Sequence, residues 1–331
     1  MSRILFLAQF APTEGTVLNA PKTPEEKFYA ETYHWKIIEV MNKMGYDFDT
    51  ASDVDYLIKH KNEYDLVWSV YNRLNFKNSE IFVQSLCEYL GLNYIGASPN
   101  IRALIEDKSM SKQLAEHIGI QTADWVVGSK EYPLSKTPPF LGKYFVKPRF
   151  GSASIGINET CLCNSWDEVL KKSELFFNEN IDVIVEKYIE GLCYGVSILN
   201  SNCGEPLIAK PHYTVSNKNG NIMTHSQKRF AEEGMKRFSS SDKTLNKQLT
   251  YLSKKYFSEI QPCDYCRIDF IVEKDSLTPY FLEVNALMNL GIKGGFVNSF
   301  LEKHFNSYDE LIAYIIELGL SKDNSKSTSK P

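Results

Sequence analysis

The sequence lacks the features that mark membrane-spanning and nucleic-acid-binding proteins. No apolar run approaches the roughly 18 residues of a membrane-spanning helix. Lysine and arginine total 37 against 41 acidic residues, a formal charge of −4, so bulk charge does not support a nucleic-acid or anionic-membrane partner. The apolar start at residues 1–8 is too short for a signal peptide, and we expect a first strand there in a cytoplasmic protein.

Cysteine, glycine and proline are also sparse. The seven cysteines are an odd number scattered along the chain, which favours reduced thiols over a disulfide framework. The close pairs Cys161-x-Cys163 and Cys263-x-x-Cys266 have no histidine at ligand spacing, so buried thiols are favoured over a metal–thiolate site. With 18 glycines, 13 prolines and 43% hydrophobic residues, the chain is not collagen-like or disordered and can bury a core.

At 331 residues the chain exceeds the length at which one core usually stops growing, which predicts two or three domains. Strand patterns at 4–7 and 66–70 alternate with helix patterns at 24–44 and 78–90, which stop at Gly45 and Gly91. This order predicts a parallel sheet. Capping boxes at Ser165 and Ser307 start two later helices, the second of which we expect to stop at Gly319.

Two alternating apolar runs place charged side chains on one face of a predicted hairpin. If the hairpin turns symmetrically about Ser276, Asp269 lies opposite Glu283 and Arg267 opposite Asn285. Because like charges directly opposite each other are unfavourable, we expect a cation between the carboxylates. Two carboxylates and an amide oxygen suit Mg²⁺ in phosphoryl transfer. The alternative is a structural hairpin whose charges face solvent.

A second pattern is a strand that delivers Lys147 into a loop rich in glycine and serine, Gly151 to Gly156. Backbone N–H groups of such a loop can point at an anion, which predicts a phosphate cradle. The loop is not a P-loop, and the chain has no Rossmann Gly-x-Gly-x-x-Gly motif. A mobile surface loop is the alternative interpretation.

Two further patterns are weaker. Residues 183–191 are an apolar run that carries Glu186, and an ordinary core strand has the same pattern. Lys108 and Lys112 stand one turn apart on a helix predicted at 107–118, an arrangement that usually marks a solvated face.

In this order the motifs resemble the ATP-grasp superfamily and, within it, the D-alanine–D-alanine ligase family. The motifs are Asp107-Lys108, Val146-Lys147-Pro148 with its loop, Glu186-Lys187-Tyr188-Ile189, Arg267-Ile268-Asp269 and Glu283-Val284-Asn285, and the resemblance covers residues 85–300. It implies an α/β and α+β fold. A parallel-sheet domain at 1–104 would precede two α+β subdomains, 105–190 and 191–320, that enclose ATP, and a disordered tail would follow at 321–331.

The resemblance also implies roles for individual residues. ATP would be bound by Lys108, Lys147, Ser152, Ser154, Glu186, Lys187, Tyr188 and Ile189. The two lysines would hold the phosphates, and Glu186 with the backbone after it would read the adenine. Two Mg²⁺ ions, or Mn²⁺, would be held by Asp269, Glu283 and Asn285. The catalytic residues would be Arg267 on the oxyanion of the tetrahedral intermediate, Lys228 near the γ-phosphate, and Ser154.

The substrate half departs from the family pattern. The N-terminal Gly-Gly-x-Ser-x-Glu element is absent, and Glu14 is the nearest substitute. Cys193 replaces a glutamate that binds the ribose hydroxyls. Gly294 falls on a serine that helps to hold a substrate carboxylate. We expect substrate contacts from Glu14, Arg229, Lys293 and Gly294, since added cations suit carboxylate-bearing substrates.

These features predict an enzyme, an ATP-grasp ligase that phosphorylates a carboxylate and joins the acyl phosphate to an amine, releasing ADP and phosphate. Amino acids or related metabolites are the expected substrates. D-alanine–D-alanine ligation is the first alternative, and a catalytically silent nucleotide-binding regulator is the second. Arg267 argues against the regulator, because a pure binder needs no oxyanion-stabilising arginine. A homodimer is a further implication of the resemblance.

Overall fold

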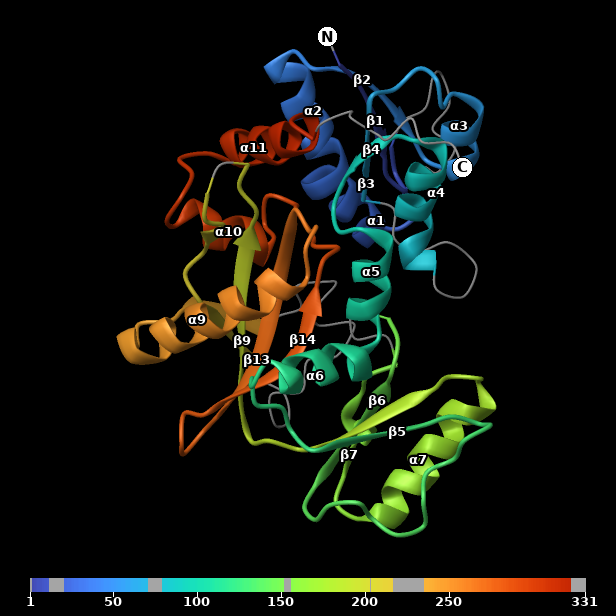
Figure 1. The fold of residues 1–331 in the computed structure, drawn as a ribbon, viewed down its shortest axis with the longest axis vertical. Helices are drawn as coiled ribbons and strands as arrows, with labels where there is room; N and C mark the ends of the chain where they lie inside the picture. Colours follow the sequence, from blue (N-terminus) through green and yellow to red (C-terminus); the bar gives the residue numbers. More distant parts are fainter. Residues whose placement is uncertain are drawn as a thin grey trace.

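Three β-sheets follow one another along the chain. The computed structural model describes residues 2–11, 21–70, 79–151, 156–202, 204–216 and 235–322. Figure 1 shows the N-terminal sheet at one end of the molecule, the central sheet with helix α7 at the other, and the C-terminal sheet between them. The parallel sheet followed by two antiparallel sheets confirms the predicted α/β and α+β fold. None of the helices in these ranges is long and apolar enough to span a membrane.

The N-terminal sheet is parallel, with the strand order β2-β1-β3-β4. The strands are β1 (Arg3–Leu7), β2 (Asp47–Ala51), β3 (Leu66–Ser69) and β4 (Asn93–Ile95), and the helices are α1 (Pro24–Tyr29), α2 (Trp35–Met44), α3 (Val54–Lys59) and α4 (Phe82–Leu90). Gly45 and Gly91 end α2 and α4 with φ angles of 75° and 74°, so both predicted stops are confirmed. A π-helical segment, Ala30–His34, interrupts the single helix predicted at 24–44.

The central sheet is antiparallel, with the order β5-β8-β6-β7, and it packs against α7 (Trp166–Asn178). Its strands are β5 (Trp125–Gly128), β6 (Tyr144–Pro148), β7 (Leu162–Cys163) and β8 (Val183–Lys187). Helices α5 (Pro99–Glu106) and α6 (Lys108–His117) lead into it from the N-terminal sheet. Ser165 caps α7 as predicted, but Glu168 accepts the N–H of Asn164 instead of the N–H of Ser165.

The C-terminal sheet has six strands in the order β12-β11-β9-β13-β14, with β10 beside β9. They are β9 (Gly191–Leu199), β10 (Leu207–Ile208), β11 (His212–Ser216), β12 (Met235–Ser239), β13 (Tyr265–Glu273) and β14 (Pro279–Asn285). Val196, Ile268 and Phe270 share one buried cluster with Leu245 and Leu249 of α9 (Lys243–Glu259). Side chains alternate along each strand, so the sheet face away from α9 carries the polar residues between these positions.

The last helices return to the first sheet. α10 (Gly295–Leu301) is followed by α11 (Tyr308–Leu320), which lies beside α2 in Figure 1. Ile4 of β1 and Ile316 of α11 belong to the same buried cluster. Gly319 was predicted to stop α11 but lies inside it. A Cβ atom there would come within 2.5 Å of Cγ1 of Ile95, so close helix–sheet packing explains the glycine.

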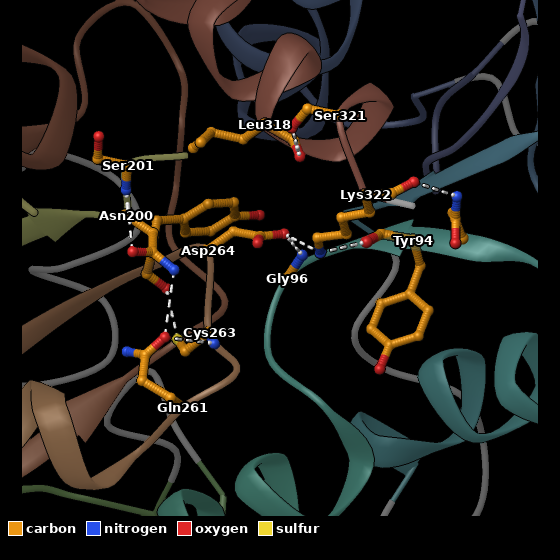
Figure 2. A network of polar contacts seen from close by, with 12 residues as sticks. Tyr94, Gly96, Asn200, Ser201, Gln261, Cys263, Asp264, Leu318, Ser321 and Lys322 are labelled. Carbon is orange, nitrogen blue, oxygen red and sulfur yellow. Dashed lines mark hydrogen bonds and ion pairs between the residues drawn. The ribbon is translucent and has the colours of Figure 1, made fainter. Parts of the chain in front are cut away.

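A polar network ties the C-terminal end of the described chain to both the N-terminal and the C-terminal sheet (Figure 2). Nζ of Lys322 donates to the carbonyl of Tyr94 and to Oδ2 of Asp264, each at 2.7 Å. The same carboxylate oxygen accepts the N–H of Gly96 at 2.7 Å. Ser321 also donates its hydroxyl hydrogen to the carbonyl of Leu318. The tail predicted to be disordered begins at 321. Ser321 and Lys322 make these contacts, and the rest of that tail lies outside the described residues.

Candidate active site

The β13–β14 hairpin has the predicted register where its polar side chains lie. Asp269 pairs with Glu283, and Arg267 pairs with Asn285. The residues therefore come together on the polar face of the C-terminal sheet. Asp269 is only 2% exposed, so the alternative of a hairpin with solvent-facing charges is wrong for this carboxylate.

Beyond Asp269 the predicted symmetry about Ser276 fails. A β-bulge lets Phe270 pair with Phe281, where a symmetric hairpin would have paired it with Leu282. Phe281 is buried and stacks on Tyr256 with ring centroids 4.6 Å apart. Bulges often lie beside active sites because they change the direction of one strand relative to its neighbour.

Arg267 forms a two-pronged ion pair with Asp269. The distances are 2.6 Å from Nε to Oδ1 and 2.6 Å from Nη2 to Oδ2. Burial by itself lowers the pKa of Arg267, but Asp269 outweighs burial, so the pKa is raised and the guanidinium stays charged. The protein thus supplies one cation beside the paired carboxylates.

Asp269, Glu283 and Asn285 are the residues that could hold a metal ion. Nδ2 of Asn285 donates to Oδ2 of Asp269 at 3.1 Å and to Oε1 of Glu283 at 3.4 Å, so the three side chains converge. To ligate an ion, the amide of Asn285 would turn so that its oxygen faces the carboxylates. Two carboxylates and an amide oxygen fit a hard cation such as Mg²⁺, whose remaining ligands are water and phosphate oxygens. Across the described ranges, no group of three or more His, Cys, Asp or Glu side chains is placed to hold a metal ion. An ion at this site would therefore need the amide of Asn285 besides the two carboxylates.

The described cysteines agree with the prediction of reduced, mostly buried thiols. The buried cysteines are Cys87, Cys161, Cys163, Cys263 and Cys266, and Cys193 is half-buried.

Sequence reasoning missed two residues beside Arg267 and Asp269. Gly195 of β9 lies between Asp269 and His212 in the sheet. A Cβ atom at Gly195 would be 2.9 Å from Cδ of Arg267 and 3.1 Å from both Oδ1 of Asp269 and Cε1 of His212. The glycine therefore leaves the space that the ion pair occupies. A glycine inside an apolar strand is a signal of such a close approach.

Arg237 of β12 was also missed. A Cβ atom at Gly295 would lie 2.1 Å from its Nη1, so the guanidinium sits directly against the start of α10. Burial and the nearby Arg267 both lower the pKa of Arg237, while Asp269 raises it. Its place beside Arg267 depends on the long-range pairing of β12 through β11 and β9, which no local pattern reveals.

A buried charge cluster lies between α6 and the central sheet. Glu186 of β8 forms ion pairs with Nζ of Lys147 at 2.6 Å and with Nζ of Lys112 at 2.7 Å. Burial raises the pKa of Glu186, but the two lysines outweigh it and lower the pKa to about 2. The carboxylate is therefore ionised at neutral pH.

Lys108 lies between this cluster and the hairpin. It is 7% exposed, its Nζ donates to the carbonyl of Gly151, and Glu283, Lys147 and Glu186 all act on its charge. Burial is the main reason that its pKa is lowered, with Glu283 opposing it. The solvated helix face considered for Lys108 and Lys112 is wrong, because Lys112 is only 1% exposed.

Asp107 fixes the start of α6 relative to β6. Its carboxylate accepts a hydrogen bond from the N–H of Ser109 at 2.9 Å. It also accepts hydrogen bonds from Nε and Nη2 of Arg149 at 3.0 and 2.6 Å. Arg149 directly follows β6, the strand that carries Lys147. One carboxylate therefore sets the positions of Lys108 and Lys147 relative to each other.

The segment predicted to read adenine lies at the end of β8, one of the two inner strands of its sheet. The N–H of Lys187 donates to the carbonyl of Asp124, and the N–H of Tyr188 to that of Lys143, both at 2.8 Å. Both N–H groups are thus already engaged in hydrogen bonds within the protein. Because the N–H of Lys187 already donates within the protein, only its carbonyl group could form a backbone hydrogen bond with adenine. The roles of Tyr188 and Ile189 stay predictions.

The loop before α10 packs on the π-helical segment. The hydroxyl of Tyr33 donates to the carbonyl of Met288 at 2.9 Å. A Cβ atom at Gly294 would lie 2.5 Å from the carbonyl oxygen of Asn289, so this loop has no room for the serine of the family pattern. Nζ of Lys293 lies 5.0 Å from the ring centre of Phe28 on α1. The two predicted substrate residues thus stand in a closely packed loop, and their contacts with substrate stay predictions.

Five predicted site residues lie outside the described residues. They are Glu14, Ser152, Ser154, Lys228 and Arg229. Their assigned roles stay predictions.

Comparison with known proteins identifies relatives by sequence. A family profile described as D-ala D-ala ligase C-terminus matches residues 108–317. The D-alanine–D-alanine ligase of Maridesulfovibrio salexigens is 26% identical over 242 residues, which cover 72% of this chain and 76% of that protein. The enzyme of the same name from Clostridium botulinum is 29% identical over 245 residues, with the same coverage.

Solved structures agree over almost the whole length. The D-alanine–D-alanine ligase of Bacillus anthracis complexed with ATP has a TM-score of 0.73 at 22% identity, covering 97% of this chain and 98% of that one. A D-Ala:D-Ser ligase from Enterococcus faecalis has a TM-score of 0.70 at 17% identity, covering 96% and 99%. The similarity in structure confirms the predicted ATP-grasp fold. Because the family profile spans well over half of the sequence, the chain belongs to the D-alanine–D-alanine ligase family of ATP-grasp ligases, enzymes that form C–N bonds.

Proposed function

We propose that this protein is an ATP- and Mg²⁺-dependent ligase that joins the carboxylate of one amino acid, or a related metabolite, to the amine of another. The observation that supports this most is the convergence of Arg267, Asp269, Glu283 and Asn285 on one sheet face, with Lys108 between them and Lys147. A charged arginine, paired carboxylates and buried lysines form a site for a reaction in which phosphate is transferred and an oxyanion develops.

The chemistry follows from the charges. A carboxylate is a poor electrophile, so its oxygen first attacks the γ-phosphorus of ATP, which releases ADP and forms an acyl phosphate. The amine then attacks the acyl carbon to form the C–N bond of a tetrahedral adduct, the nitrogen loses a proton, and the C–O bond to phosphate breaks as the amide forms. Mg²⁺ held by Asp269, Glu283 and Asn285 would neutralise phosphate charge. Lys108 and Lys147 would bind the phosphates, and Arg267 would stabilise the oxyanion formed when the amine attacks.

D-Alanine is the first substrate to test, because the relatives are named as D-alanine–D-alanine ligases. The loop before α10 is the reason to test other amino acids as well, since it excludes the expected serine at Gly294 and carries Lys293. A cytoplasmic location and a homodimer remain predictions from the sequence.

The test is a panel of D- and L-amino acids, singly and in pairs, incubated with ATP and Mg²⁺ and read by ADP release and product mass. ATP-dependent formation of an amide is the expected result. Nucleotide binding without turnover on any pair would instead favour the silent regulator. Formation of D-alanyl-D-alanine as the main product would identify the narrower activity.

Asp269→Asn tests the metal assignment. We expect kcat to fall roughly 100-fold or more, because a metal ion contributes several kcal/mol to the stabilisation of transition-state charge. Asp275→Asn, an exposed position in the turn of the same hairpin, is the matched control and should keep wild-type activity. Equal activity of a folded Asp269→Asn variant and the control would contradict the assignment.

A further inference from the structure

Glu186 is shared by two lysines that come from different elements. Lys147 reaches it from the neighbouring strand β6, and Lys112 reaches it from α6. Lys112, Lys147 and Glu186 are 1%, 3% and 4% exposed, so all three charges are buried. The group carries one more positive than negative charge, and Lys108 adds a further cation nearby.

Lys112 and Lys147 differ in the number of further partners that their ammonium groups have. Nζ of Lys112 also donates to the carbonyl of Phe281 on β14 at 3.2 Å. Within the described residues, Glu186 is the only ion-pair partner of Nζ of Lys147. Lys112 is thus fixed at two points, one on each of the two sheets that the site lies between, whereas Lys147 is fixed at one.

Because Glu186 is buried, the loss of either lysine partner affects the stability of its charge. A buried carboxylate that loses all its partners is strongly destabilising, whereas one that keeps a well-placed partner is tolerated. With Lys112 in place, Lys147 can turn from Glu186 to a phosphate group while Glu186 stays paired. Without Lys112, the same movement would leave Glu186 as an uncompensated buried charge.

We propose that Lys112 is a positioning residue that permanently neutralises Glu186 and so allows Lys147 to exchange between Glu186 and a nucleotide phosphate. This inference rests on the proposed ATP site. It assigns to Lys112 a role in the affinity for nucleotide without any contact between Lys112 and the nucleotide.

The test is a double-mutant cycle on nucleotide binding, measured by calorimetry with a non-hydrolysable ATP analogue and Mg²⁺. Lys112→Met should weaken binding by about tenfold or more, which corresponds to ~1.4 kcal/mol or more. In a Glu186→Gln background, whose own affinity sets the reference, Lys112→Met should weaken binding by less than about threefold, because no carboxylate is then left unpaired when Lys147 moves. Lys247→Met, an exposed lysine on α9, is the control for loss of one positive charge and should bind like the wild type.

A purely structural role for Lys112 gives the opposite pattern. Lys112→Met would then weaken binding as much in the Glu186→Gln background as in the wild type, and that result would overturn the proposal. If Lys112→Met does not fold, Lys112→Gln takes its place in the cycle, since its amide can still donate to Phe281 but carries no charge. Failure of the wild-type protein to bind nucleotide would refute the proposed function itself, which separates the two outcomes.

Discussion

Gly195 shows how a missing side chain shapes the site. The Arg267–Asp269 ion pair lies across this position, and His212 approaches it from the other side. Any Cβ atom there must displace one of the three side chains. The backbone at this glycine needs no unusual conformation, so the requirement comes from space alone.

Gly195→Ala should therefore impair catalysis while the protein stays folded. We expect kcat to fall roughly 10- to 100-fold, since small displacements of a catalytic group have effects of this size. Nucleotide affinity should change little, because the lysines around Glu186 lie on other elements. Separate measurements of kcat and of nucleotide binding check this, and an unchanged kcat would show that Arg267 tolerates the displacement.

His34 gives the unfolding free energy a dependence on pH. It is 1% exposed, and burial lowers its pKa from 6.5 to about 3. Below pH 6.5 the unfolded chain takes up a proton that the folded protein does not, so stability decreases as pH falls. The decrease should be about 1.4 kcal/mol per pH unit for this residue, down to about pH 3. His212, whose pKa is also lowered to about 3 by burial and by Arg267 and Arg237, adds in the same direction.

The comparison with His34→Gln isolates the contribution of His34. A glutamine can still accept the N–H that Phe10 donates to Nδ1 of His34, but it does not titrate. Urea unfolding between pH 7 and pH 5 should show a smaller loss of stability in the variant. Parallel pH profiles for the two proteins would contradict the assignment.

At the scale of elements, Asp107, the N-cap residue of α6, also binds a residue of another element. Asp107 and Asp242 both cap a helix by accepting two backbone N–H groups, at the starts of α6 and α9. Only Asp107 also holds an arginine, Arg149, and through it the end of β6. The two positions form a matched pair.

Asp107→Ala should be more harmful than Asp242→Ala. Loss of a cap costs about 1 kcal/mol, and we expect this for Asp242→Ala in thermal unfolding. Asp107→Ala should cost roughly 1–3 kcal/mol more, because Arg149 loses its charged hydrogen-bond partner. Only Asp107→Ala should also raise the KM for ATP, since Lys108 and Lys147 lose their common support. Equal effects of the two variants would show that Arg149 contributes nothing.

The parts of the site that could be predicted from sequence are those that local periodicity fixes. Alternation along β13 and β14 gave the pairs Asp269–Glu283 and Arg267–Asn285, because a strand has a period of two. The bulge after Asp269 has no local signal of this kind. The burial of Lys112 could not be predicted either, since its partners Glu186 and Phe281 lie far away in the sequence.

At the scale of the whole molecule, Lys322 links sheets from the two ends of the chain. Its ammonium group joins Tyr94 of β4 to Asp264, which lies just before β13. Asp264 is only 4% exposed, so it depends on its partners. The ion pair of Lys43 with Asp309 also joins the two ends, but the Lys43 side chain is 68% exposed.

Lys322→Met should therefore lower the stability by roughly 1–3 kcal/mol, because a buried carboxylate loses a charged partner. Lys43→Met should change it by less than about 1 kcal/mol, as is usual for exposed ion pairs. Thermal unfolding of both variants checks the difference. A Lys322→Met variant as stable as Lys43→Met would show that Gly96 alone satisfies Asp264.

The packing of α11 on the N-terminal sheet also bears on how the protein is made. Ile4 and Ile95 share a buried cluster with Ile312 and Ile316, which the ribosome adds more than two hundred residues later. Domains generally fold as they emerge during synthesis. Here the first sheet to emerge keeps part of its apolar surface uncovered until the segment that forms α11 has also been translated, so its core is completed late in synthesis.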